Sequence, residues 1–543
     1  MHKRLLIIIL FVMASNNSLC AQFINDLSGS LESQITYYTD DDKVVNPGDT
    51  DFRSNNYLRF NYFKNKFSAS IQFESYIEEA LLGYAPEFDQ KFGFSMASVS
   101  YSTSHAKLSG GYLFDQFSSG MTYRSWEDRQ LGINNALVGI NIDVHLSNKI
   151  QLKSFLGKQK YGFDISDGTL YGLNSLIPLG EKFDLDLGIA GRYQAYESSN
   201  SDFKEFTNLY SGKIMYTSGS FYTHLEAIYK GEDALVEFGN VIDSRLFSGN
   251  ALAFNIGYFK PGFGVDFTFR RMENMAFYTD REAYANIYNQ LIVNYLPALT
   301  KQHNVGLSNI YVYQSQPQLN FIAGGKAGEI GQQIDLYYKF IKENSLAKKY
   351  GTVLAFNYAA WYGLNADFDL ENRQYSADFF KYGDKYYTDL NLELRNQWSK
   401  QWRSSIYWIR QFYNKERLEA SSGTVTTNIA AIDSYYTINN MNELRFQLEH
   451  LWTQDDKQNW AGGLIEYNFL RKFSVYVSDQ YNYGNENEIE RIHYYNAGGS
   501  FRHKKTKFSI NYGRQRGGLI CVGGVCRFVP KSNGLSFGMN LFI

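Results

Sequence analysis

A run of charged and aromatic residues near position 125 is the densest group of chemically capable side chains in this sequence. It reads Arg124-Ser125-Trp126-Glu127-Asp128-Arg129. Two guanidinium groups and two carboxylates this close together can place opposed charges across a water-filled opening, as in the constriction of a pore. The same residues can instead form ion pairs on a solvated loop that holds neighbouring segments. Both interpretations stay open, and the first predicts that residues 118–135 fold inward and narrow a pore.

Two cysteines form the second candidate site. Cys521 and Cys526 flank Val522-Gly523-Gly524-Val525, and adjacent glycines let a chain reverse direction. In an exported protein, two cysteines spaced in this way favour a disulfide. Two thiols without a nearby histidine are an incomplete zinc site. We therefore expect a disulfide in an outer loop and no metal.

No pattern typical of an enzyme stands out in the sequence. The histidines are scattered, and no two have the helical spacing of zinc proteases. The Gly-x-Ser-x-Gly match at Gly534-Leu535-Ser536-Phe537-Gly538 lies in an alternating strand segment and so is not a nucleophile elbow, and no phosphate-binding glycine loop opens a helix. We expect no enzymatic activity and no cofactor. A barrel hydrolase assembled from distant serine and histidine residues is the least favoured alternative.

The element that must position the two candidate sites is a strand with one apolar and one polar face. In the segment 67–74, Phe67, Ala69, Ile71 and Phe73 alternate with polar residues, and 183–189, 390–395 and 535–541 repeat this period of two. A transmembrane barrel turns the apolar face to lipid and the polar face to its lumen, and short turns alternate with long loops. The pattern predicts an all-β fold, a single antiparallel barrel of about 26 strands within a range of roughly 22 to 26.

The alternating pattern also predicts where the connections lie and which charged residues face the lumen. The long outer loops are expected at about 39–53, 79–91, 118–135, 196–205, 232–248, 363–383, 416–424 and 517–532. Between them the chain is interpreted as strands and short turns, with the count least secure at 278–327 and 425–444. The charged residues expected to point inward are Glu74, Asp184, Asp186, Glu393, Arg395, Arg445 and Glu449. Both signs of charge occur among them, which indicates a polar lumen without strong ion selectivity.

Composition supports the barrel and excludes some partners. Aromatic residues make up 17% of the chain, and tyrosine pairs such as Tyr386-Tyr387 and Tyr435-Tyr436 stand near predicted strand ends, as in the aromatic girdles of outer-membrane barrels. Only 7 prolines occur, which suits long paired strands. The net charge of −2 gives no reason to expect a nucleic-acid partner.

The N-terminus predicts export. Met1-His2-Lys3-Arg4 is basic, and the apolar run from Leu5 to Met13 is too short to span a membrane as a helix. We interpret residues 1–21 as a signal peptide, cleaved after Cys20 or Ala21, and residues 22–543 as the barrel. A lipoprotein signal at Cys20 is the alternative, but Leu19 is too large for that pattern.

The predicted width of the barrel bears on function. About 26 strands enclose a lumen roughly 50 Å across, which would leak if it were open. No separate plug domain precedes the first strand, so we expect inward-folded loops, a flattened barrel or a partner that fills the lumen. The favoured role is a transport or secretion conduit or scaffold in the outer membrane, in contact with its lipid. The alternative is an assembly component that binds an envelope lipoprotein or a periplasmic partner.

Several segments carry a resemblance to a known group. They are 124–137, His450-Leu451-Trp452, 479–484, Tyr512-Gly513-Arg514-Gln515-Arg516-Gly517-Gly518 and 521–527. Together they resemble an uncharacterised family of Bacteroidota outer-membrane β-barrels, classed only as a domain of unknown function. The resemblance covers essentially the whole chain after the leader. It implies an envelope location and a barrel, and it supplies no substrate, catalytic residue or mechanism.

Overall fold

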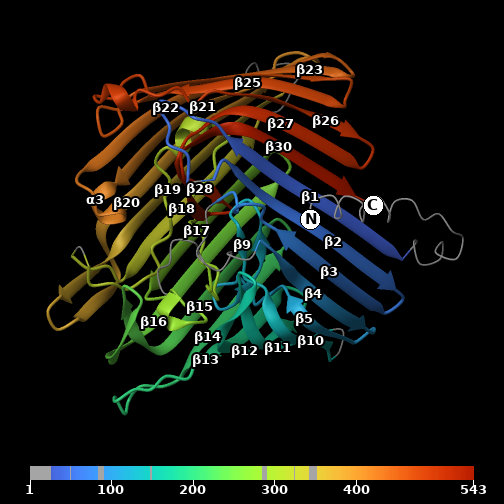
Figure 1. The fold of residues 1–543 in the computed structure, drawn as a ribbon. Helices are drawn as coiled ribbons and strands as arrows, with labels where there is room; N and C mark the ends of the chain where they lie inside the picture. Colours follow the sequence, from blue (N-terminus) through green and yellow to red (C-terminus); the bar gives the residue numbers. More distant parts are fainter. Residues whose placement is uncertain are drawn as a thin grey trace, which may run out of the picture.

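The alternating segments form strands that close into one antiparallel barrel (Figure 1). The computed structural model describes residues 26–48, 50–82, 91–146, 149–283, 290–322, 324–340 and 351–542. The expected signal peptide, residues 1–21, lies outside the described residues. No helix in the described part of the chain is long and apolar enough to cross a membrane.

Twenty-four strands make up the barrel wall. They are β1 (Leu27–Tyr38), β2 (Phe52–Lys64), β3 (Phe67–Ser75), β4 (Phe92–Ser102), β5 (Ala106–Leu113), β10 (Leu137–His145), β11 (Gln151–Tyr161), β12 (Asp164–Leu179), β13 (Phe183–Tyr193), β14 (Phe206–Ser218), β15 (Phe221–Glu237), β16 (Asn240–Lys260), β17 (Phe263–Glu273), β18 (Gly328–Lys339), β19 (Thr352–Asp369), β20 (Gln374–Gln397), β21 (Trp402–Asn414), β22 (Thr424–Asn439), β23 (Asn442–Trp452), β24 (Trp460–Phe469), β25 (Phe473–Tyr481), β26 (Asn496–His503), β27 (Thr506–Gln515) and β30 (Ser532–Phe542).

Each wall strand pairs with the next, and the last pairs with the first. The closing pair β1–β30 runs from Ser30 opposite Phe542 to Tyr38 opposite Gly534. Closure leaves no unpaired strand edge, which a β structure in lipid requires. The observed 24 strands confirm the predicted fold and fall within the predicted range.

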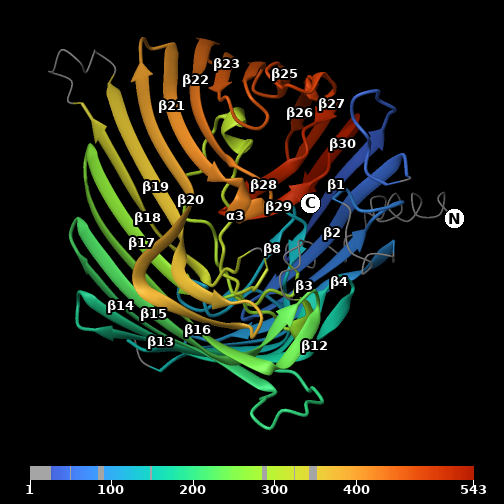
Figure 2. The ribbon, with the colours of Figure 1, turned by 90° about the vertical axis from the view of Figure 1, so that its left-hand side faces the viewer.

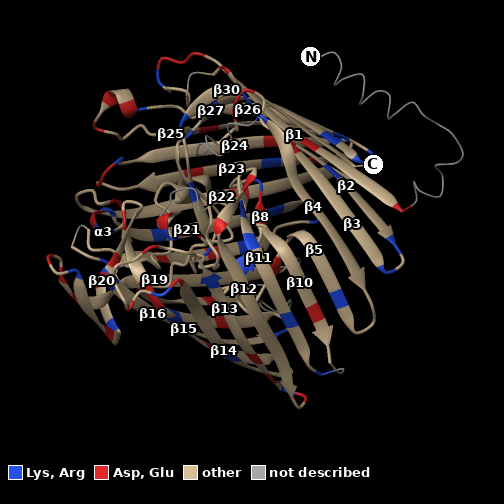
Figure 3. Cartoon of the chain, turned by 60° about the horizontal axis from the view of Figure 1, so that its bottom comes forward, with Lys and Arg blue, Asp and Glu red and all other residues tan. Residues whose placement is uncertain are grey.

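The outer face of the wall is apolar. Large apolar side chains that are about half exposed stand at alternate positions of successive strands, among them Val99, Leu108, Ile140, Leu156, Leu173, Leu187, Leu225, Leu448 and Ile465. Long uncharged stretches run along the strands in Figure 3, and many of the charged residues stand at turns and loops. A closed barrel with an apolar outer belt is the fold of a membrane-spanning protein.

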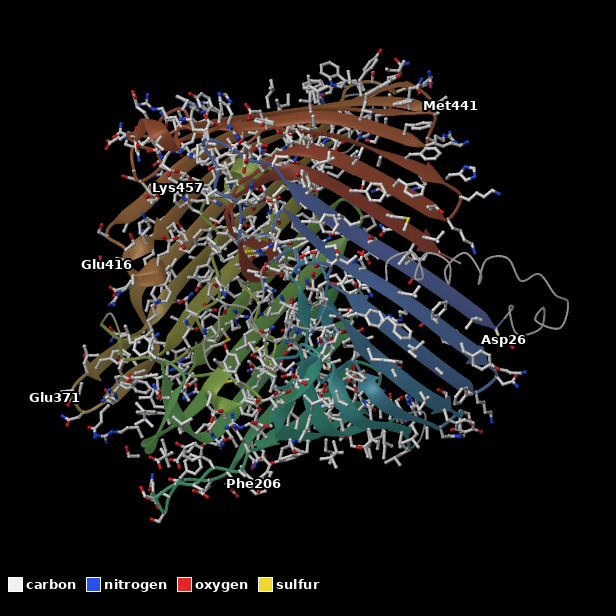
Figure 4. The ribbon with its side chains drawn as sticks, viewed as in Figure 1. Asp26, Phe206, Glu371, Glu416, Met441 and Lys457 are labelled. Carbon is white, nitrogen blue, oxygen red and sulfur yellow. A yellow bond between two sulfur atoms is a disulfide. The ribbon has the colours of Figure 1, made fainter. Side chains whose placement is uncertain are left out.

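The two ends of the barrel differ. One end carries short connections together with Asp26 and Met441, and the other carries the long loops, with Glu371, Glu416 and Lys457 (Figure 4). The expected short turns at 63–66, 179–182, 260–262, 398–401 and 470–472 join strands at the first end. The loops at 39–51, 76–91, 114–136 and 194–205 join strands at the second end.

Two expected loops are in fact strand extensions. The segment expected to loop at 232–248 continues β15 and β16 to a tight turn at Phe238 and Gly239, which both have positive φ and so form the kind of turn that suits a two-residue hairpin. The segment 363–383 likewise extends β19 and β20 to a turn at 370–373. Charged and turn-forming residues in these hairpins mask the strand pattern, and their apolar residues, among them Phe247 and Tyr375, pack against Phe321.

The expectation of strands within 278–327 is wrong. No wall strand lies between β17 and β18 among the described residues, and this accounts for a count below 26. The segment enters the barrel instead, and Figure 2 shows β8 (Glu127–Asp128), β28 (Gly518–Val522) and β29 (Val525–Val529) also inside the ring of wall strands. The girdle interpretation of Tyr386 and Tyr387 is wrong as well, because both are buried in a cluster inside the barrel.

Candidate functional site

Three loops from the same end of the barrel meet in its lumen and form one body, which we call the plug. The first plug segment is 114–136 and the third is 516–531. The second is 274–327, of which the structure describes residues 274–283, 290–322 and 324–327. The first contains β6 (Asp115–Gln116), β7 (Arg124–Ser125), β8 and β9 (Ile133–Asn134). The third contains the β28–β29 hairpin.

Backbone hydrogen bonds join the first and second plug segments. The amide of Arg124 donates to the carbonyl of Val293 at 2.9 Å, and the amide of Tyr295 donates to the carbonyl of Gly120 at 2.9 Å. These bonds extend strand-like pairing between segments that lie about 170 residues apart in the sequence, and they satisfy backbone groups that the lumen would otherwise bury.

The third segment is fastened to both others. The hydroxyl of Tyr295 donates to the carbonyl of Gly523 at 2.7 Å, and the amide of Ala298 donates to the carbonyl of Gly524 at 2.8 Å. The buried Arg527 donates to the carbonyl of Leu131 in the first segment at 2.6 Å. The plug is therefore a single hydrogen-bonded unit.

Polar side chains of the wall hold the plug. Lys301 pairs with Glu393 of β20 at 3.1 Å. The ring of His303 contacts the carboxylate of Asp389 at 2.9 Å. Glu449 of β23 accepts the amide of Leu307 at 2.7 Å. The predicted inward residues Glu393 and Glu449 thus bind the plug as well as facing the lumen.

Apolar contacts reinforce this docking. Val305 and Leu307 pack against Ile409, Ile429 and other wall residues in one cluster, and all four are fully buried. A second cluster includes Phe117, Val293, Leu170, Ala190 and Leu209. Inward positions on these strands are therefore apolar where the plug touches them, and the lumen is not polar throughout as the alternation alone predicted.

The predicted charged loop is the first plug segment. The guanidinium of Arg124 lies 3.9 Å from the ring centre of Tyr295 and 4.9 Å from that of Trp126. Trp126 contacts Tyr295 edge to face, with ring centres 5.6 Å apart, so it packs within the plug. Asp128 caps a turn by accepting the amides of Gln130 and Leu131.

Arg129 makes the contacts that reach the wall. It donates to Glu32 of β1 at 2.5 Å and to Gln72 of β3 at 2.9 Å. Its guanidinium also lies 3.3 Å from Glu127 and 4.3 Å from the ring centre of Tyr57. The structure thus brings Glu127 and Arg129 together at one place on the wall, whereas Arg124 and Trp126 lie within the plug.

Cys521 and Cys526 are joined by a disulfide that closes the β28–β29 hairpin. The hairpin lies against the second plug segment, since Gln302 donates to the carbonyl of Cys521 at 2.9 Å. The expected outer loop is therefore a plug element whose tip contacts the plug interior. No group of three histidine, cysteine, aspartate or glutamate residues that could hold a metal occurs in the part of the chain that the structure describes.

The plug leaves a gap along one sector of the wall, which we call the seam passage. On β26, β27, β30 and β1 most inward positions are small or neutral, and Lys507 and Glu32 are charged exceptions. The small or neutral residues are Gly498, Ser500, Ser509, Asn511, Gly513, Gly534, Ser536, Gly538, Gln34 and Thr36. The passage has a volume of about 470 Å³. Small side chains explain the gap, because they do not reach the plug as the aromatic and charged residues elsewhere do.

The seam passage adjoins a wider cavity at the short-turn end, and plug residues border it at the long-loop end. A second cavity of about 610 Å³ adjoins it and shares Lys507, Ser509 and Asn511 as lining residues. That cavity reaches Arg471 and Lys472 in a short turn. At the other end the passage is lined by Arg129 and Gln130 of the first plug segment and by Val529 and Pro530 of the third.

An ion pair between the long-loop end of β27 and the loop 39–51 ties down that loop beside the passage. Arg514 contacts Asp41 at 2.8 Å, and both side chains are largely buried. Burial acts to raise the pKa of Asp41, but hydrogen bonds from Arg514 and from the backbone amides of Lys43 and Val44 outweigh it and lower the pKa. The loop 39–51 is therefore held by a carboxylate that stays ionised at neutral pH.

The second plug segment is the main feature that the alternation pattern did not reveal. A signal for it exists in the sequence. Pro297 and Pro317 lie within this stretch, and proline is rarely tolerated inside a paired strand. Two prolines 20 residues apart could have marked 278–327 as irregular.

The fold and the plug together define a class: a membrane-spanning β-barrel whose lumen is filled by its own loops. Within that class the chain belongs to a family of unknown function, DUF6029, which matches residues 1–542. No curated protein sequence matches it.

Some solved barrels are similar in outline. They include the translocation pore of the P pilus usher PapC (9% identity, 95% of this chain and 99% of that chain covered, TM-score 0.44), the E. coli P pilus tip assembly intermediate PapC-PapD-PapK-PapG (9%, 95% and 60%, 0.49) and Pseudomonas aeruginosa OccK3 (13%, 81% and 100%, 0.38). Similarities this low carry no information on function.

Proposed function

We propose that this protein is a gated conduit for small polar solutes in the outer membrane, which it reaches through a signal peptide at residues 1–21. Residues 22–543 form the conduit, and the resemblance noted above supports a host among the Bacteroidota. The observation that carries the proposal is the seam passage, a polar gap of about 470 Å³ between plug and wall that adjoins a larger cavity at the short-turn end.

The lining of the passage favours neutral polar solutes. Hydroxyl and amide groups on the inward face can exchange hydrogen bonds with a hydroxylated solute at little cost, because they serve as both donors and acceptors. Fixed charge is sparse along the passage, where Lys507 and Arg129 are the lining residues that carry it. The first plug segment acts as the gate, since Arg129 borders the passage at its long-loop end.

The test uses one blocking variant and one matched control on the same strand. Asn511 lines both adjoining cavities, so Asn511→Trp places a large ring at their junction. Ile510 is the preceding residue and is 53% exposed on the lipid face, so Ile510→Trp adds the same ring outside the barrel. Purified proteins in liposomes are assayed for uptake of small neutral sugars.

The expected result is uptake by the wild type and by Ile510→Trp, and loss of most uptake with Asn511→Trp. Equal uptake by all three proteins would show that solutes do not use the seam passage. No uptake by the wild type, together with a lipoprotein or periplasmic protein that stays bound through purification, would favour the alternative of an assembly component.

A further inference from the structure

Three cationic side chains are buried together where the second plug segment meets the wall. They are Arg192 of β13, Lys230 of β15 and Arg281 of the plug, each 3% exposed or less. Burying one unneutralised charge is costly, so a group of three requires compensation.

One carboxylate lies in direct contact with this group. One carboxylate oxygen of Asp233 pairs with Arg192 at 2.5 Å, and the other pairs with Arg281 at 2.8 Å. Both of its oxygens are thereby engaged by guanidinium groups.

Lys230 makes its hydrogen bonds to uncharged acceptors. Its ammonium donates to the side-chain oxygen of Asn274 at 3.2 Å and to the carbonyl of Ala276 at 3.1 Å. An ammonium has three N–H groups, so one remains for a further acceptor.

The neighbouring carboxylates are engaged elsewhere. Asp280 accepts the amide of Gly168 at 2.8 Å, and Glu282 accepts the side-chain amide of Gln194 at 3.0 Å. Among the described residues, neither is bonded to any of the three cations. This group therefore contains three buried cations and one carboxylate that is in contact with them.

A small cavity lies among these groups. Its volume is about 30 Å³, and its lining includes Arg192, Lys230, Asp233, Asn274, Tyr278 and Arg281. The Nε of Arg192 is buried and has no hydrogen-bond partner among the described residues. The space suits one monatomic ion or one to two water molecules, since a single water needs roughly 10–15 Å³ on this scale.

We infer that this cavity binds a monatomic anion of the halide class, chloride in the cell. The anion accepts from the free N–H groups of Arg192 and Lys230 and offsets the excess positive charge. Because these residues belong to the wall and Arg281 belongs to the plug, a bound halide fastens the second plug segment to β13 and β15. Docking of the plug is then linked to halide concentration.

The direct test is crystallographic. Crystals of the full-length protein grown in sodium bromide are measured at the bromine absorption edge. The inference expects an anomalous peak in the cavity of the wild type and none there in Lys230→Met. Absence of a peak in the wild type at 0.5 M bromide overturns the inference, whatever the variant does.

A second measurement reports on plug docking. Hydrogen exchange of residues 274–283 is compared in sodium chloride and in sodium gluconate at equal ionic strength. At a chloride concentration ten times Kd, exchange limited by local opening should slow about tenfold in the wild type. Lys230→Met should lose this dependence. Lys326→Met is the control, because Lys326 bonds to Gln316 within the plug and does not line the cavity. This variant should keep the chloride dependence. Equal chloride dependence in all three proteins would place the effect elsewhere and overturn the inference.

Discussion

Replacement of Arg129 by alanine tests whether the first plug segment gates the long-loop end of the seam passage. The change removes the donors to Glu32 and Gln72 and the guanidinium that lies over Tyr57, and it leaves the backbone of the first plug segment intact. We expect the segment to separate from β1 and β3 more often, because these contacts tie residues 127–130 to the wall.

The magnitude follows from the interactions that the alanine side chain cannot make. Arg129 and Glu32 are 23% and 29% exposed, so their hydrogen-bonded pair is only partly screened and contributes roughly 1–2 kcal/mol. The cation–π contact with Tyr57 adds about 0.5 kcal/mol. A net loss of about 2 kcal/mol raises the population of the open form by about 30-fold.

The assay is sugar uptake into liposomes together with single-channel recording. Lys91→Ala is the matched control, because Lys91 forms an exposed pair with Glu78 at 3.4 Å and neither residue lines the passage. We expect Arg129→Ala to raise the uptake rate and the fraction of time open, and Lys91→Ala to leave both unchanged. Glu32→Gln combined with Arg129→Ala should add little, because both changes remove the same pair. The gating argument fails if Arg129→Ala and Lys91→Ala behave alike while both barrels assemble.

Three further outcomes can be measured. Deleting residues 120–133 should raise permeability to large antibiotics while the barrel still assembles, because that segment fills part of the lumen and contributes no wall strand; unchanged permeability would show that the remaining plug segments suffice. Mass spectrometry without reductant should find Cys521 linked to Cys526, and replacing both by serine should destabilise the hairpin by about 2 kcal/mol, seen as faster hydrogen exchange there with unchanged heat-modifiable gel mobility. The pKa of Asp41 is lowered in the folded protein, so its pairing with Arg514 contributes stability above about pH 4, the ordinary range of the carboxyl. This contribution is lost as the pH falls through the lower pKa of the folded protein. Hydrogen exchange of loop 39–51, corrected for intrinsic rates, should therefore become faster on acidification, and the acceleration should be smaller in Asp41→Asn.

The wall of the barrel was predictable because lipid imposes a strict period of two. Segments such as 67–74 and 183–189 follow it in sequence and in structure. The pattern fails where an inward-facing side chain packs against the plug instead of meeting water. Ile409 and Ile429 point inward and are apolar because the plug covers them, and no count of alternating residues could distinguish that from an outward position.

The candidate site was predictable only in part, for a related reason. The charged run 124–129 was recognisable from its composition, and its place in the lumen followed from the width of the barrel. Its contacts could not be predicted, because Tyr295 lies in a segment interpreted as strand. The seam passage depends on glycines and serines from four strands at both ends of the chain, and only closure of the barrel brings them to one sector.

The plug draws its three segments from the early, middle and late parts of the chain, and the hydrogen bond from Arg527 to Leu131 spans 396 residues. The β28–β29 hairpin is held between β27 and the final strand, so it cannot take its place before almost the whole polypeptide has been synthesised. Contacts this distant in sequence form slowly, because the intervening chain must be ordered first. Assembly therefore has a defined last event: the barrel closes only when β30 joins β1, and a chain truncated before β27 would leave a ring that is unclosed and lacks the third plug segment.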